Sequence, residues 1–304
     1  MDAFSGIVLL DKPAGITSFQ ALFPLKRIFH TRRVGHAGSL DMRASGLIVA
    51  AVGRATRLLS YVEAAQKSYS FRLHLGYETA TLEWDGELTE QDSREVSFSL
   101  AEVEAVLSKF RGLIQQVPPN YSAIKIKGHR ASDLMLRGRE FEIPARAVTI
   151  DRLEIKGLAT TPTENSSGRA VTSIDMECDC SKGTYIRSLC RDIALELGSF
   201  GCVSHIRRTR IGALPVTAAV SPEALTVEDL KTSPSVLAFP SVLLTEDQMA
   251  VIRNGGYVPW NLPIEIPEGL EKLVFALDEN GVAQSLCTYE PGRILSKFFI
   301  GVGE

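Results

Sequence analysis

The 304-residue chain lacks the short motifs of several large enzyme classes. It contains no GxxxxGK[ST] phosphate loop and no GxGxxG dinucleotide fingerprint. The His-x-Glu and Pro-Cys-x-x-Cys pair of zinc nucleobase deaminases is absent, as is the Gly-x-Ser-x-Gly of α/β-hydrolases. Composition is ordinary, with 45 % hydrophobic and 23 % charged residues, which excludes collagenous, disordered and low-complexity chains.

Cysteine is scarce, and long apolar runs are missing. The five cysteines are an odd number in a long chain and show neither a disulfide framework nor the paired spacing of a zinc site. The N-terminus has no basic region, and the apolar residues 6–10 end at Asp11-Lys12-Pro13. No apolar stretch approaches the roughly 20 residues that span a bilayer. We expect a soluble, reduced, cytoplasmic protein.

Strong net charge is lacking too, since the formal charge is −3 and the pI about 6.0. The average hides blocks of opposite sign. Residues 20–57 carry seven bases against one acid, or +6, and residues 120–146 carry +3, whereas residues 77–106 carry −8 and residues 222–304 carry −7. Arg207, Arg208 and Arg210 form a further basic cluster. A single basic block is as compatible with a solvated helix face, but three favour a polyanionic partner.

The hydrophobic pattern predicts alternating strands and helices in the first two hundred residues. Strands are expected at 5–11, 47–52 and, from the alternation of Phe71, Leu73 and Leu75, around 71–75. Helices are expected from Thr17 or Ser18 to about residue 28, and at 54–65, 100–110 and 186–197, the last ended by Gly198. Residues 120–146 show little apolar periodicity and are interpreted as a mobile surface insertion.

The C-terminal part has a different pattern. Four prolines between 215 and 240 indicate a linker with a short helix. Residues 273–277 and 282–287 flank Asp278-Glu279-Asn280-Gly281, which predicts a β-hairpin in a small β-rich domain. We therefore place one domain at residues 1–235 and a second at 236–304.

The segment Gly35–Gly46 carries the first candidate site. It holds small or flexible residues around His36 and Asp41. Asp41 is the only acid between Asp11 and Glu63, so the surrounding positive charge favours its ionised form, as suits a nucleophile or an electrostatic stabiliser. A cap on a helix or turn is the more common role for a single Asp.

Two further segments are candidates. Arg187 opens the strong helix, where a cation is unfavourable unless it pairs with a carboxylate such as Asp41 or with a phosphate; an exposed Arg is the alternative. Tyr69, in Lys67-Ser68-Tyr69, could stack on a nucleobase, although a Tyr in the core or at its rim is more common. Residues 116–125, with Pro118-Pro119, form a stiff connection.

Taken together, six motifs in order resemble the TruB family of tRNA pseudouridine synthases. They start at Leu10–Ser18, continue through Gly35–Gly46, Lys67–Tyr69, Val117–Lys125 and Cys180–Arg187, and close at His205–Gly212. The resemblance implies an α+β fold with a mixed, largely antiparallel central sheet flanked by helices. It also implies a small C-terminal β-barrel of the RNA-binding PUA type. The implied activity is isomerisation of uridine to pseudouridine at position 55 in the T-loop of tRNA, by base flipping, in a monomer without cofactor, metal or guide RNA.

The resemblance also implies roles for single residues. Asp41 matches the catalytic nucleophile, Tyr69 the Tyr that stacks on the flipped uracil and takes part in proton abstraction, and Arg187 the Arg that pairs with the catalytic Asp. His36 matches the His that fills the space left by the flipped base. The remaining substrate-binding positions are Tyr185, Ile206 and Lys12, although the Lys12-Pro13 motif is regarded as mainly structural.

There are departures from the family pattern. Met42 stands where Pro usually follows the catalytic Asp, and Ser39 and Ser45 replace Thr. The Asp-rich turn expected near residues 79–86 carries Glu83 and Asp85. Two other functions stay open: a guide-RNA-dependent relative of the archaeal and eukaryotic type, and a non-enzymatic tRNA-binding or tRNA-folding protein. The chemical route, attack on C1′ or elimination to a glycal, is open as well.

Overall fold

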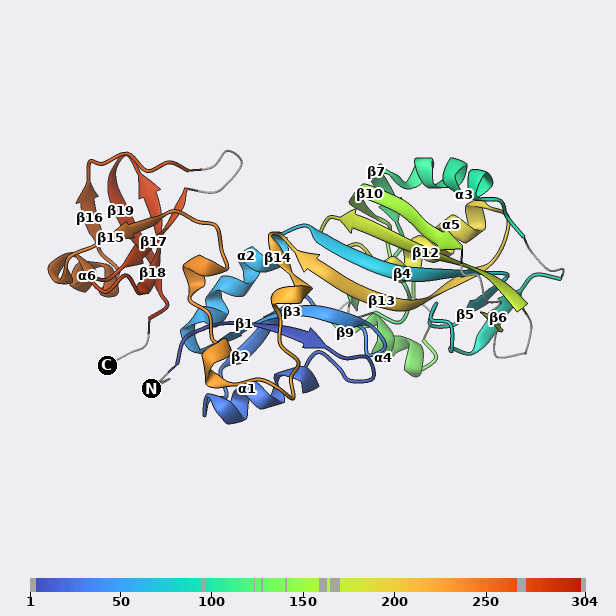
Figure 1. Ribbon diagram of the computed structural model, residues 1–304, viewed down its shortest axis with the longest axis horizontal. Helices are drawn as coiled ribbons and strands as arrows, with labels where there is room; N and C mark the ends of the chain where they lie inside the picture. Colours follow the sequence, from blue (N-terminus) through green and yellow to red (C-terminus); the bar gives the residue numbers. More distant parts are fainter. Residues whose placement is uncertain are drawn as a thin grey trace. The chain divides into compact units, whose positions relative to one another are not determined.

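The computed structural model describes residues 4–93, 97–122, 124–126, 128–139, 141–158, 163–164, 170–266 and 272–301. The chain divides into two compact units. Residues 1–42, 46–63 and 214–304 form the first unit, and residues 43–45 and 64–213 form the second. Elements are labelled as in Figure 1, where the colours follow the sequence from blue to red.

The second unit is built on an antiparallel sheet. Its strands lie in the order β13 (Gly201–Ile211), β4 (Lys67–Leu75), β12 (Ala170–Cys180), β10 (Arg146–Leu158) and β7 (Gly112–Gln116). Helix α5 (Ile186–Glu196) packs on β13 and β4, α3 (Leu100–Leu107) packs on β10, and the two helices touch each other (Figure 1). One face of the sheet is therefore covered by helices. The strands and helices predicted around residues 71–75, 100–110 and 186–197 are confirmed.

Alternation along β4 explains the two faces of this sheet. Tyr69, Phe71 and Leu73 point to one side and are buried, whereas Ser70 and Arg72 on the other side are half-buried. Ser68 and His74 depart from the pattern, because they are 5 % and 1 % exposed although they lie on the polar side. Below we call the two sides of this sheet the Tyr69 face and the Arg152 face.

Short elements complete the second unit. They are β5 (Tyr77–Thr79), β6 (Leu88–Gln91), η3 (Ser108–Phe110), β8 (Lys125–Ile126), β9 (His129–Arg130), α4 (Ala131–Leu136) and β11 (Thr163–Glu164). The described part of residues 120–146 thus contains a small hairpin and a short helix, and its role as a mobile surface insertion stays a prediction. Leu134 of α4 is 7 % exposed, while Leu136 is 78 % exposed at the surface.

The first unit begins with three strands. Strand β3 (Ser45–Val52) pairs antiparallel with both β1 (Gly6–Lys12) and β2 (Val34–Ala37). The short helices η1 (Gln20–Leu22), α1 (Phe23–Ile28), η2 (Gly53–Leu58) and α2 (Leu59–Ala64) follow β1 and β3. The predicted strands at 5–11 and 47–52 are confirmed, and the predicted helices at 17–28 and 54–65 are each divided into a 3-10 turn and an α-helix.

The proline-rich residues 215–240 are packed against β1. Ile7 exchanges backbone hydrogen bonds with Lys231 at 2.8 and 3.0 Å, and Val220 does the same with Leu9 and Asp11 at 3.0 and 2.9 Å. The short elements here are β14 (Leu214–Pro215), η4 (Val216–Ala218), η5 (Val227–Asp229) and η6 (Ser233–Ser235). The expected short helix is present as three 3-10 helices, and the backbone of the segment pairs with β1.

The C-terminal residues form a curled five-stranded sheet. The order is β15 (Ser241–Leu243), β17 (Leu273–Leu277), β18 (Ala283–Glu290), β19 (Gly292–Phe299) and β16 (Tyr257–Trp260), with α6 (Glu246–Arg253) beside it. Met249, Ile252 and Val274 belong to its core. The predicted hairpin is confirmed, since Asp278 accepts hydrogen bonds from the N–H groups of Asn280 and Val282 at 3.0 and 2.9 Å.

Candidate active site

Asp41 lies in the connection between β2 and β3. The two strands are paired from Val34 to Ala37, and the chain leaves them at Gly38 with φ of +74°. This left-handed conformation favours glycine and turns the backbone sharply. Asp41 and Met42 are both exposed at the far end of the connection. A carboxylate presented in this way is accessible to a ligand.

The backbone on both sides of Asp41 is fixed by the Lys12–Ser18 segment. The Lys12 ammonium donates to the carbonyl oxygens of Met42, Pro13 and Ile16 at 3.2, 2.9 and 2.7 Å. The Ser18 hydroxyl donates to the carbonyl of Leu40 at 3.0 Å and accepts its N–H at 2.8 Å. Lys12 is fully buried and Ser18 is 5 % exposed. We call these contacts the Asp41 clamp.

The clamp gives Lys12 a physical role. Burying an ammonium group is costly unless hydrogen bonds compensate, and three carbonyl oxygens provide them here. Gly15 adds a backbone hydrogen bond from its N–H to the Met42 carbonyl at 2.8 Å. Lys12 therefore positions the Asp41 connection, in line with a mainly structural motif. Sequence reasoning missed Ser18 in this role, although it lies within the first motif.

His36 belongs to the same unit as Asp41. It lies on β2 opposite Ala50 of β3, two residues before the turn at Gly38, and its side chain is half-buried. The structure therefore groups His36, Lys12 and Asp41 in the first unit. Tyr69, Tyr185, Arg187 and Ile206 all lie in the second unit.

Tyr69 occupies the middle of the sheet. Its register partners are Cys178 on β12 and Arg208 on β13, and its side chain is 8 % exposed. Burial raises the pKa of the Tyr69 phenol to about 12, although the Arg208 guanidinium opposes this rise. The phenol is therefore protonated at neutral pH. It can stack and donate a hydrogen bond without carrying charge.

Arg187 is buried at the start of α5, so the alternative of an exposed Arg is excluded. Its side chain is 3 % exposed, and its two terminal nitrogens donate to the carbonyls of Thr81 at 3.0 Å and Tyr121 at 2.9 Å. These carbonyls belong to two segments far apart in the sequence, the turn after β5 and the segment after Pro118-Pro119. The guanidinium thus ties both segments to the helix.

Tyr185 precedes α5 as its N-cap residue. The buried Gln116 side chain accepts the Tyr185 N–H at 2.8 Å and donates to its carbonyl at 3.1 Å, which fixes the backbone of the N-cap residue. The Arg146 guanidinium lies over the Tyr185 ring, 4.7 Å from the centroid. Gln116 was not identified from the sequence, where it appears only as the residue before Val117.

Ile206 lies at an irregularity of β13. The register with β4 shifts between Ser204 and Arg207, and His205 adopts φ of +54°. Ile206 is 8 % exposed while His205 is exposed. The Ser204 hydroxyl is hydrogen-bonded to both His205 and His74, at 2.6 and 2.7 Å, so buried polar contacts support the bulge.

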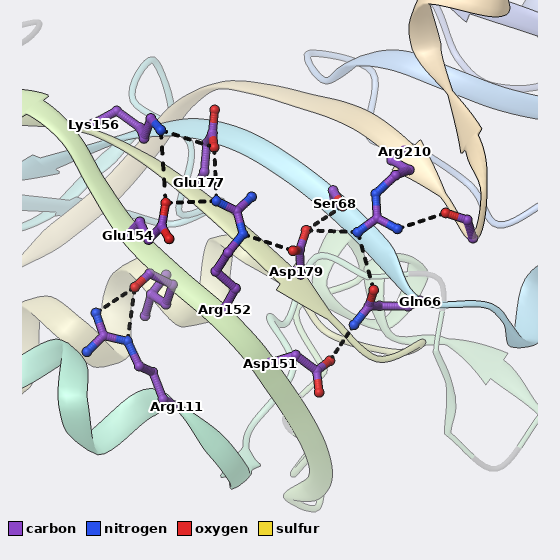
Figure 2. A network of polar contacts seen from close by, with 12 residues as sticks. Gln66, Ser68, Arg111, Asp151, Arg152, Glu154, Lys156, Glu177, Asp179 and Arg210 are labelled. Atoms are coloured by element: carbon purple, nitrogen blue, oxygen red, sulfur yellow. Dashed lines mark hydrogen bonds and ion pairs between the residues drawn. The ribbon is translucent and has the colours of Figure 1, made fainter.

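The basic cluster at 207–210 is not a surface patch. Arg208 is 1 % exposed and shares the Tyr69 face, while Arg210 forms an ion pair with Asp179 at 3.3 Å. Figure 2 shows Asp179 between Ser68, Arg152 and Arg210 on the other side of the sheet. Arg208 and Arg210 therefore make contacts within the unit from opposite sides of the sheet, which their interpretation as one basic block did not predict.

Other expectations concern metals, membranes and thiols. Within the described residues, no group of three His, Cys, Asp or Glu side chains could hold a metal ion. The same residues contain no helix that is long and apolar enough to cross a membrane. The five cysteines, all described, are buried and form no disulfide, as predicted.

Sequence comparisons show what this chain is similar to. The family described as TruB family pseudouridylate synthase (N terminal domain) matches residues 26–186. A tRNA pseudouridine synthase B of Corynebacterium diphtheriae is 36 % identical, covering 98 % of this chain and 96 % of the relative. Another, from Cutibacterium acnes, is 37 % identical over 86 % of this chain and 88 % of the relative.

Solved structures extend the likeness to the fold. A chain in a structure described as an H/ACA RNP bound to a substrate RNA containing 2′-deoxyuridine superimposes with a TM-score of 0.67. The two sequences are 19 % identical, and the superposition covers 98 % of this chain and 85 % of the neighbour. A Cbf5-Nop10-Gar1 complex gives a TM-score of 0.66 at 20 % identity, covering 97 % and 85 %. At this identity the likeness concerns the fold.

Proposed function

Because the chain belongs to the TruB family of pseudouridylate synthases, we propose that it isomerises uridine to pseudouridine in tRNA. The support is the family match together with relatives named tRNA pseudouridine synthase B that align over nearly the whole chain. The reaction breaks the glycosidic bond between C1′ and N1 of uracil, rotates the base and joins C1′ to C5, while C5 loses its hydrogen as a proton and N1 gains a proton. No atoms are gained or lost, so no co-substrate is consumed.

We further propose uridine 55 in the T-loop as the target and Asp41 as the nucleophile. The target is proposed from the family, and the nucleophile is supported by the Asp41 clamp, which fixes the backbone on both sides of an exposed carboxylate. A nucleophile must be held near its target atom, and fixed geometry lowers the entropic part of the barrier. Met42, in place of the usual Pro, is held through its carbonyl by Lys12 and Gly15.

Tyr69 and Arg187 are the other proposed catalytic residues. A neutral Tyr69 phenol suits stacking on the flipped uracil, and as a base it would first have to lose a proton that burial retains. The Arg187 guanidinium would pair with Asp41 and keep the carboxylate ionised. Its bonds to Thr81 and Tyr121 fix its position.

The remaining residues would recognise the RNA. Flipping a base out of the T-loop costs a few kcal/mol. His36 would fill the space left by the base, while Tyr185 and Ile206 would line the uracil pocket and Lys12 would act through the clamp. The curled C-terminal sheet, PUA-like in form, would contribute RNA binding, and the enzyme would work as a cytoplasmic monomer without cofactor or guide RNA.

The Asp41→Asn variant tests this function. We expect it to abolish pseudouridine formation in an unmodified tRNA, as mapped by mass spectrometry, while the Kd for tRNA changes less than threefold. Asp247→Asn is the matched control, because Asp247 is an exposed Asp of α6 far along the chain. Turnover retained by Asp41→Asn would exclude Asp41 as the nucleophile.

A guide-RNA-dependent enzyme is the second candidate, because the structural neighbours include H/ACA assemblies. Pure protein incubated with an unmodified T-arm stem-loop separates the two, since product formed without a guide RNA excludes the dependent type. A non-enzymatic RNA-binding role is the third. Saturating tRNA binding with no product in either assay would favour it.

A further inference from the structure

Two aromatic rings of the first unit are exposed to solvent. Phe19, before η1, is 56 % exposed and Phe23, the first residue of α1, is 50 % exposed. Their centroids are 5.3 Å apart and their planes are nearly perpendicular, at 84°. Phe is normally a core residue, so two adjacent exposed rings indicate an interaction surface. We call them the Phe19–Phe23 pair.

The charge around this pair points to an anionic partner. The Lys26 ammonium lies 4.2 Å from the Phe19 centroid and 5.4 Å from the Phe23 centroid. No acidic residue occurs between Asp11 and Asp41, and the exposed bases there are Arg27, Arg32 and Arg33. An apolar protein partner would not require this charge, whereas unpaired RNA presents base π-faces and phosphates together.

The pair is also linked to the Asp41 connection. Phe19 directly follows Ser18, whose hydroxyl makes two hydrogen bonds with Leu40, the residue before Asp41. All these residues belong to one unit. Nucleotides bound on the Phe19–Phe23 pair would therefore lie beside the segment that carries the proposed nucleophile.

We propose that the Phe19–Phe23 pair is a stacking platform for unpaired bases of the substrate RNA, with Lys26 and the neighbouring arginines bound to its phosphates. The inference rests on the proposed function, because it takes RNA as the substrate. It adds a specificity element to that function: the platform recognises loop nucleotides next to the target and does not bind the paired stem. Aromatic stacking tolerates different bases, so this element selects unpaired structure over sequence.

The double variant Phe19→Ser/Phe23→Ser tests the platform in the full-length protein. The probes are a fluorescently labelled T-arm stem-loop and the same stem closed as a blunt duplex. A base stacked on an aromatic side chain contributes enough for the stem-loop Kd to rise about tenfold in the variant. The duplex Kd should stay within twofold of the wild-type value.

Three control variants test whether aromatic stacking is the cause of the weaker stem-loop binding. Leu195→Ser removes an equally exposed apolar side chain, 52 % exposed on α5, and should leave both Kd values unchanged. Phe19→Tyr/Phe23→Tyr should bind like the wild type, because it keeps the π-faces. Phe19→Leu/Phe23→Leu should lose most of the affinity that the Ser pair loses. A Leu pair that binds like the wild type would overturn stacking.

The outcomes separate this inference from the proposed function. An unchanged stem-loop Kd in the Ser pair overturns the platform, while pseudouridine formation by the wild type still supports the enzyme. A wild type that binds the stem-loop but forms no pseudouridine counts against the proposed function. The ratio of the stem-loop Kd of the Ser pair to that of the wild type still tests the platform in that case. A wild type that binds neither RNA overturns both. Dimerisation that the Ser pair abolishes, with unchanged RNA affinity, would assign the rings to self-association.

Discussion

The two faces of the sheet in the second unit use polar residues in different ways. Arg208, on the Tyr69 face, and Arg187, at the start of α5, are almost completely buried. On the Arg152 face, Arg152 is 37 % exposed and contacts the carboxylates of Glu154, Glu177 and Asp179 (Figure 2). The same strands thus carry fixed, buried cations on one side and a solvent-screened ionic network on the other. Buried cations fix positions at a high desolvation cost, whereas exposed ones contribute little stability.

The largest effect is expected from Arg187→Met. The variant leaves the Thr81 and Tyr121 carbonyls without the guanidinium donors, so the free energy of unfolding should fall by about 2–4 kcal/mol. Activity should fall at least 100-fold even where the protein is folded. Urea unfolding and single-turnover kinetics measure the two losses.

Arg187→Lys is the companion variant. It keeps the charge, but a single ammonium group cannot reach both carbonyls as the two terminal nitrogens of a guanidinium do. We therefore expect an intermediate loss of stability and a kcat about tenfold lower, with little change in KM. A Met variant as stable and as active as the wild type would contradict the contrast between the faces.

Sequence patterns predicted much of this contrast but not its exceptions. Alternation along β4 gave the strand and its apolar side, and the resemblance gave Asp41 and Arg187 as site residues. The burial of Arg208 was not predictable from the cluster Arg207, Arg208 and Arg210, because its side depends on the pairing of β13 with Tyr69 of β4. Such non-local pairing is not encoded in any local pattern.

The contacts of the Asp41 clamp could not be predicted from the sequence for the same reason. Ser18 and Leu40 are distant in the chain, and the periodicity of each segment says nothing about the other. Residues 215–240 look like a linker because prolines break regular elements, yet their backbone groups pair with β1. The proline content predicted that residues 215–240 contain no long helix, but it did not predict that they pack against β1.

His74 is expected to give the next largest effect, because it is an ionisable group buried on the Arg152 face. Burial, together with the nearby charges of Arg72 and His205, lowers the pKa of His74 from the ordinary 6.5 to about 4. The unfolded chain therefore binds a proton between pH 6.5 and 4 that the folded protein does not. Stability is complete above pH 6.5 and is lost as the pH falls, by about 2 kcal/mol between pH 7 and pH 5.

His74→Gln measures this contribution. The amide can still bond Ser173 or Ser204 but does not titrate, so its unfolding free energy should depend less on pH than that of the wild type. Urea unfolding at several pH values from 8 to 5 provides the comparison. Parallel curves for the two proteins would show that His74 titrates normally in the folded state.

The smallest effect is expected from Arg152→Met on the exposed face. Three carboxylates lose a partner, at N–O distances of 2.8 to 3.2 Å, but they stay accessible to water and to salt. We expect a loss of about 0.5–1 kcal/mol that shrinks in 1 M salt, with activity within twofold of the wild type. Lys109→Met, which removes a single exposed pair with Glu196, should have no measurable effect. A loss above 3 kcal/mol for Arg152→Met would mean that the network behaves like a buried one, and the distinction between the two faces would fail.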